Sequence, residues 1–243
     1  MSQANETRWE RLGAASGLVS FALGAVGGAL ERGWPDANDS VAVAAFIADE
    51  RAAILGQSMA FVLSAVVFVW FAGALRSFLA RAEGGTGRLS AVVFGTACTW
   101  ASLQLVAQAF QVGQAMAPDG GRQPALLWTM AAMFSTSNLP LGAMLLAVAV
   151  VALRHGALPA WLGAISLVAA AAQTLLWLGT VVRSGPLAPN GLLTYVLYPL
   201  FAVWIVPTVV VMVRRTGAAH DAAREAPRTG ARPLGPREPL PQG

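Results

Sequence analysis

Six long apolar stretches constrain this chain more than any other feature of its sequence. They cover residues 12–30, 52–75, 89–117, 125–153, 158–182 and 192–213, and none contains Asp, Glu, Lys, Arg or His. A helix rises about 1.5 Å per residue, so about 20 residues cross the hydrocarbon core of a bilayer. We therefore predict an all-α polytopic bundle of six transmembrane helices, whose main partner is the lipid bilayer.

Composition excludes the other broad classes of protein. Hydrophobic residues make up 56% of the 243 residues and charged residues 12%. A disordered chain needs low hydrophobicity and high charge, and a soluble domain needs a larger charged surface. The formal net charge of +4 could suggest nucleic acid as a partner. We exclude nucleic acid because the Arg residues cluster beside apolar stretches and in one tail, as membrane topology places them.

The positions of the basic residues predict the orientation. All 16 are Arg, and an inside N-terminus leaves only Arg32, Arg51, Arg122 and Arg183 outside. Positive residues are enriched in cytoplasmic segments. We therefore expect both termini in the cytoplasm and the bundle in the cytoplasmic membrane, with residues 1–11 as a short cytoplasmic N-terminus. We interpret the first stretch as a retained helix and not as a cleaved signal, because its 19 residues exceed a usual signal core.

Two segments outside the spans invite a structural prediction. In the outer loop 31–51, Asp39 or Ser40 can cap a helix whose apolar side (Val41, Ala44, Ala45, Ala48) would lie on the membrane surface. This helix either stands alone or continues into the second span as one long helix. The tail 214–243 is rich in Arg, Pro and Gly, and we expect it to be disordered. It is either a topological anchor or a contact for anionic headgroups.

The polar side chains inside the spans are amides and hydroxyls. Residues 104, 108, 111 and 114 are all Gln, and the first three share one helix face. Pro140, which follows Asn138, removes a backbone donor and predicts a kink with a small polar pocket. By helical rise, the amides fall at similar depths in the outer half of the membrane. The candidate binding site consists of Gln57, Gln104, Gln108, Asn138 and Gln173.

These amides have two interpretations. They either bind a solute at the centre of the bundle, as in transporters with broken helices, or hold the helices together through hydrogen bonds. A second feature, the spacing of Gly13, Gly17, Gly24 and Gly28, permits close helix packing. The partner of this stripe is either a helix of the same chain or a second protein, including another copy.

The residue types argue against catalysis. The spans contain no carboxylate, His or Lys to act as an acid or a base, and the single Cys98 has no basic neighbour. We therefore predict no enzymatic activity, no metal site and no cofactor. Coupled transport usually needs an intramembrane carboxylate or His, and none is present.

One short pattern resembles a family. Residues 154–163 (RHGALPAWLG), with the segment from Arg11 to Leu18, look like uncharacterised multi-helix bacterial membrane proteins grouped as domains of unknown function. The resemblance implies an integral membrane bundle over about residues 8–213 and no known activity. The functional prediction is a non-enzymatic structural or partner-binding membrane module. The alternative is a carrier or channel for a small neutral or zwitterionic solute.

Reporter fusions test the orientation. A fusion at Gly85 should report the cytoplasm, and one at Asp119 should report the exterior, because an inside N-terminus gives the cytoplasm most of the Arg residues. Paired phosphatase and fluorescent-protein reporters measure this directly. The opposite pattern at both positions would overturn the orientation.

Overall fold

The computed structural model describes residues 3–35, 39–117, 124–182, 184–189 and 191–225. The helices are α1 (Gln3–Leu30), α2 (Ser40–Glu83), α3 (Arg88–Met116), α4 (Pro124–His155), α5 (Ala160–Leu178), the 3-10 helix η1 (Gly179–Val181), α6 (Leu192–Leu197) and α7 (Pro199–Glu225). Within these ranges there is no strand. Six helical segments are long and apolar enough to span a membrane, so the predicted all-α architecture with six spans is confirmed.

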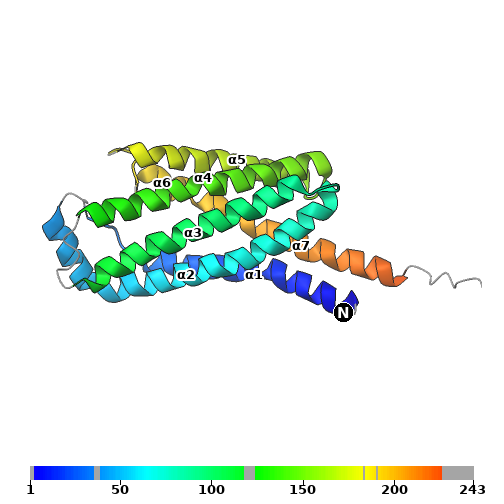
Figure 1. The fold of residues 1–243 in the computed structure, drawn as a ribbon, viewed down its shortest axis with the longest axis horizontal. Helices are drawn as coiled ribbons and strands as arrows, with labels where there is room; N and C mark the ends of the chain where they lie inside the picture. Colours follow the sequence, from blue (N-terminus) through cyan, green and yellow to red (C-terminus); the bar gives the residue numbers. More distant parts are fainter. Residues whose placement is uncertain (1–2, 36–38, 118–123, 183, 190, 226–243) are drawn as a thin grey trace, which may run out of the picture.

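The helices form a ring that follows the order of the chain. Each of α1 to α5 packs against the next, and α7 closes the ring by packing against both α5 and α1. The helices run along one long axis, and the first turn of α1 lies at the same end as the last turn of α7 (Figure 1). This arrangement agrees with an even number of crossings, and the inside position of the termini stays a prediction.

The surface of the bundle is apolar, as a lipid environment requires. Every long helix exposes large hydrophobic side chains to its surroundings, among them Leu18, Leu63, Val106, Leu146, Val168 and Val203. A water-soluble protein of this size rarely exposes such a continuous apolar surface. The outward-facing hydroxyls of Thr99 and Ser102 donate to the backbone carbonyls one turn earlier, so neither hydroxyl proton needs water.

The outer-loop helix is continuous with the second span. α2 runs unbroken through 44 residues, and its first turns lean across the end of the bundle (Figure 1). Of the two predicted capping residues, Asp39 is the one that caps this helix. Its carboxylate accepts hydrogen bonds from the backbone N–H groups of Val41 and Ala42 at 3.2 and 3.0 Å. The side that packs inward carries Val43 and Ile47, whereas Val41 is exposed. The long-helix alternative therefore describes this segment.

The turn between α2 and α3 depends on glycine and on one carboxylate. Gly84, Gly85 and Gly87 have φ values of 66°, 57° and 60°, which other residues rarely adopt. The Glu83 carboxylate accepts hydrogen bonds from the backbone N–H groups of Leu89 and Ser90 at 2.8 and 2.9 Å. Glu83 thus satisfies two free donors at the start of α3, a role that the sequence analysis missed.

The last span differs from its prediction at both ends. Pro199 separates the short α6 from α7, because proline has no N–H to continue the α6 hydrogen-bond pattern. α7 then continues to Glu225, so residues 214–225 are helical and not part of a disordered tail. This stretch contains no proline and is rich in alanine, which favours helix. The rest of the predicted tail, 226–243, lies outside the described residues.

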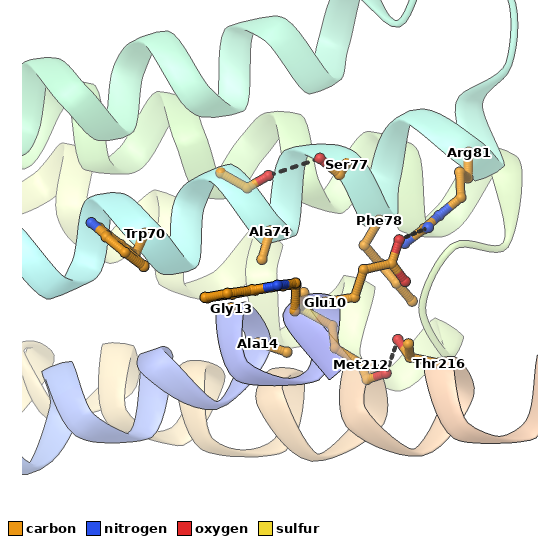
Figure 2. Close-up of a pocket in the computed structure, with 12 residues that line it drawn as sticks. Glu10, Gly13, Ala14, Trp70, Ala74, Ser77, Phe78, Arg81, Met212 and Thr216 are labelled. Carbon is orange, nitrogen blue, oxygen red and sulfur yellow. Dashed lines mark hydrogen bonds and ion pairs between the residues drawn. The ribbon is translucent and has the colours of Figure 1, made fainter. Parts of the chain in front are cut away.

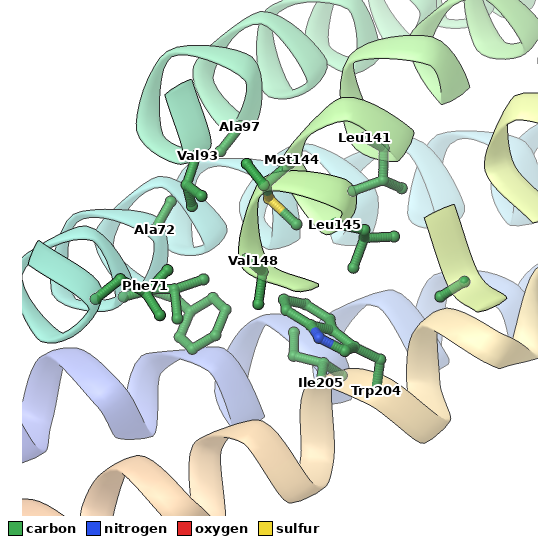
Figure 3. Close-up of a cluster of buried hydrophobic side chains, with 14 of the residues drawn as sticks. Phe71, Ala72, Val93, Ala97, Leu141, Met144, Leu145, Val148, Trp204 and Ile205 are labelled. Atoms are coloured by element: carbon green, nitrogen blue, oxygen red, sulfur yellow. The ribbon is translucent and has the colours of Figure 1, made fainter. Parts of the chain in front are cut away.

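An apolar core fills the half of the bundle that holds the start of α1 and the end of α7 (Figure 1). Phe71, Leu145 and Trp204, from α2, α4 and α7, are fully buried and lie together there (Figure 3). The Trp204 indole N–H donates to the Ser166 hydroxyl at 2.9 Å, so its polar atom is satisfied in the core. Toward the other end, a second, smaller cluster contains Val43, Ile47, Ile54, Ala115, Leu127 and Met130.

The glycine stripe of α1 contacts helices of the same chain. A Cβ at Gly13 would lie 2.9 Å from the Cβ of Ala74 in α2. A Cβ at Gly17 would lie 2.6 Å from Val209 in α7 and 2.7 Å from Phe71 in α2. Near Gly24, the hydroxyls of Ser20 and Ser64 each donate to the other residue's backbone carbonyl, at 2.9 and 2.8 Å. Gly28 has no such neighbour within 4 Å.

Alanine substitutions at two of these glycines should change the free energy of unfolding differently. Gly17→Ala should lower the free energy of unfolding by about 1–3 kcal/mol, because the new methyl group overlaps buried side chains. Gly28→Ala should leave it unchanged or raise it by up to about 1 kcal/mol, because alanine favours helix and meets open space. Unfolding in mixed detergent micelles measures both. Equal effects would show that α1 does not pack as described.

Candidate functional site

The buried amides lie between the two apolar clusters. Gln57 of α2, Gln108 of α3, Asn138 of α4 and Gln173 of α5 are all buried, and Gln104 of α3 is half-buried. None of the five candidate residues is therefore fully exposed on the surface of the bundle. Such burial fits the general rule that an amide is costly to leave in lipid.

Two hydrogen bonds donated by amides connect neighbouring helices. The Gln104 Nε2 donates to the Ser137 hydroxyl at 3.0 Å, which joins α3 to α4. Ser137 in turn donates to the backbone carbonyl of Phe134 at 2.7 Å, six residues before Pro140. Two turns further along the same face of α3, the Gln111 Nε2 donates to the Gln57 Oε1 at 3.4 Å. α3 is therefore tied to both of its neighbours in the ring.

Gln173 lies where α4 and α5 approach closely. A Cβ at Gly142 would lie 3.5 Å from the Cβ of Gln173 and 3.2 Å from the backbone oxygen of Ala170. The small residue at 142 lets the two helices come this near. Gln173 is 0% exposed, yet neither its amide nitrogen nor its amide oxygen has a hydrogen-bond partner among the described residues.

Several other buried polar atoms also lack a hydrogen-bond partner among the described residues. Among the described residues, the buried polar atoms without a partner are Ser58 Oγ, Trp100 Nε1, Gln108 Oε1, both amide atoms of Gln114 and both of Gln173. An unpaired polar group in an apolar medium costs several kcal/mol. In the bilayer core, lipid tails offer these atoms no donor or acceptor.

With Gln111 and Gln114 included, the amides extend as a column along α3. By helical rise, Gln104 and Gln114 are separated by about 15 Å along α3. Gln114 is 0% exposed and directly precedes Ala115, which belongs to the smaller apolar cluster. Gln111 and Gln114 were noted in the sequence with Gln104 and Gln108 but were not included in the candidate site. The available signal was that Gln111 lies three positions after Gln108 and Gln114 three positions after Gln111, because residues three apart are neighbours on a helix surface.

The described residues contain no group of three or more His, Cys, Asp or Glu side chains that could hold a metal ion. The groups available inside the bundle are therefore neutral hydrogen-bond donors and acceptors. Amides of this kind can recognise a polar, uncharged or zwitterionic molecule by hydrogen bonding. Comparison with known proteins adds no family: no family model, curated protein or solved structure matches this chain.

A double-mutant cycle tests the link between α3 and α4. Gln104→Leu and Ser137→Ala each remove one partner of the 3.0 Å hydrogen bond, and the double variant removes both. We expect a coupling energy of about 0.6 kcal/mol and no more than about 1.7 kcal/mol, the range for such bonds within membranes. Free energies of unfolding in mixed micelles give this value. Strict additivity would show that the bond does not form.

Proposed function

We propose that this chain is a multi-pass protein of the cytoplasmic membrane that binds and passes a small neutral or zwitterionic polar solute. The supporting observation is that Gln108, Gln114 and Gln173, at most 1% exposed, present five amide atoms without a partner among the described residues. A buried amide that serves only to join helices would have its partner on the neighbouring helix. The unpaired atoms can therefore bond water or a solute once the packing around them opens.

The proposed role involves no catalytic step. The six apolar stretches carry no acid, base or metal ligand that could activate a substrate. It also involves no coupling to protons or sodium ions, which usually requires an intramembrane carboxylate or His. A solute would move down its own concentration gradient, and the amides would replace part of its hydration shell.

A second candidate is a membrane module that acts only through helix packing. The hydrogen bonds between Gln104 and Ser137, and between Ser166 and Trp204, favour this function, because each joins two helices. The two candidates differ in one physical respect. A solute pathway must admit water to the amide column, whereas a packing module keeps that column dry.

Thiol labelling separates the two candidates without knowledge of the solute. Cys98 is the only cysteine, so Cys98→Ser gives a background without thiols. In that background we compare Gln108→Cys, inside the amide column, with Val106→Cys, which faces lipid on the same helix. A small water-soluble methanethiosulfonate reagent is added on both sides of reconstituted vesicles.

We expect Gln108→Cys to be modified at least about tenfold faster than Val106→Cys, because only a thiol that meets water ionises and reacts. The extent of modification is read by mass spectrometry. Equally slow labelling of both variants would reject the solute pathway and favour the packing module.

Solute flux provides the functional measurement. Vesicles containing the protein are exposed to gradients of urea, glycerol, glycine or glucose, and their swelling is followed by light scattering. We expect flux above that of empty vesicles for at least one of these, and its loss in Gln108→Leu/Gln173→Leu. The control Thr99→Leu, which changes an exposed hydroxyl of α3, should retain it. Unchanged flux in the double variant would contradict the proposed site.

A further inference from the structure

A hollow of about 320 Å³ lies between α1, α2 and α7, away from the amide column (Figure 2). Its lining residues fall within 9–14 of α1, 70–81 of α2 and 212–216 of α7, so it lies toward the end of the bundle that holds the start of α1 and the end of α7 (Figure 1). Its lining changes character along its length. One end carries an ion pair and the other end is apolar.

The polar end holds one acidic and one basic side chain. Arg81 of α2 donates to the carboxylate of Glu10 in α1, and the two side chains are 54% and 31% exposed. Each keeps unused hydrogen-bonding capacity, because a guanidinium has five N–H groups and a carboxylate accepts about four hydrogen bonds. Both can therefore bind a further polar group without separating.

The apolar end extends toward the middle of the bundle. Trp70 lies eleven residues before Arg81, about 16 Å along α2. Between them, Gly73 and Ala74 line the hollow with almost no side-chain bulk. Trp9 and Trp70, both lining residues, are 55% and 68% exposed, so the hollow opens sideways to the lipid.

We propose that this hollow binds a phospholipid with a zwitterionic headgroup that ends in a primary ammonium, phosphatidylethanolamine. The phosphate would accept hydrogen bonds from Arg81, and the ammonium would donate to Glu10. One acyl chain would lie along Gly73, Ala74 and Trp70. The length from the ion pair to Trp70 corresponds to about half of the hydrocarbon core, which is the depth that one leaflet's chains occupy.

The ion pair itself favours this headgroup over the other common ones. An anionic headgroup without an ammonium would place its phosphate beside the Glu10 carboxylate, and Arg81 alone would have to offset two negative charges. A choline headgroup carries the positive charge but has no N–H to donate to that carboxylate. The ethanolamine headgroup offers an acceptor for Arg81 and a charged N–H donor for Glu10, and it adds no further negative charge beside that carboxylate.

Native mass spectrometry of the purified full-length protein in a non-ionic detergent measures the binding. The protein is titrated with phosphatidylethanolamine, phosphatidylcholine and phosphatidylglycerol of identical acyl chains. We expect phosphatidylethanolamine to bind about tenfold more tightly than phosphatidylcholine, as one charge-assisted hydrogen bond would give. Equal binding of these two lipids, or tighter binding of phosphatidylglycerol, would overturn the proposal.

Two variants locate the site. Glu10→Gln should abolish the preference for phosphatidylethanolamine over phosphatidylcholine, because the ammonium loses its ionic partner. Ser77→Phe should fill the hollow from its exposed side and weaken the binding of phosphatidylethanolamine about tenfold. The control Ser102→Phe changes an equally exposed serine with the same backbone hydrogen bond on α3, outside the hollow, and should have no effect.

The outcome for each variant is decisive. A preference that survives Glu10→Gln would reject the role of the ion pair. Undiminished binding to Ser77→Phe, or an equal loss in Ser102→Phe, would reject the hollow as the site. Melting temperatures in lipid-free detergent confirm that the variants are folded before lipid is added.

Discussion

The absence of water around the spans governs this structure. Lipid tails can neither donate nor accept a hydrogen bond, so a polar group within the bilayer is stabilised when it finds its partner inside the protein. The backbone meets this requirement through helices, and the outward hydroxyls of Thr99 and Ser102 meet it by donating to their own helix. The amides cannot satisfy all of their hydrogen bonds within their own helix as easily, because each carries two N–H groups and an acceptor oxygen. Their burial in the bundle follows from this limit.

The sequence predicted those parts of the fold that depend on local composition. Uninterrupted apolar stretches identify membrane-spanning helices because charge is costly at that depth, and the Asp39 cap follows from the preference of Asp for helix N-termini. Packing between helices is a different matter. The residues around Gly17 in the sequence do not show that it faces Val209 and Phe71. Glu83 accepts two backbone hydrogen bonds only because the glycine turn brings the start of α3 beside it.

The candidate site was predictable to a similar extent. Helical spacing placed Gln104, Gln108 and Gln111 on one face. Spacing could not say which residue on a neighbouring helix each would meet, because tilt and offset between helices come from packing. Gln57 meets Gln111 and not Gln104, and Gln104 meets Ser137. Pairing is therefore a property of the assembled bundle.

α2 is about 66 Å long by helical rise, roughly twice the thickness of the hydrocarbon core. Its first turns bend across the end of the bundle (Figure 1), where Val43 and Ile47 join the smaller apolar cluster with Leu127 and Met130 of α4. This cluster therefore fixes the extra length of α2 against the start of a helix that is not its neighbour in the chain.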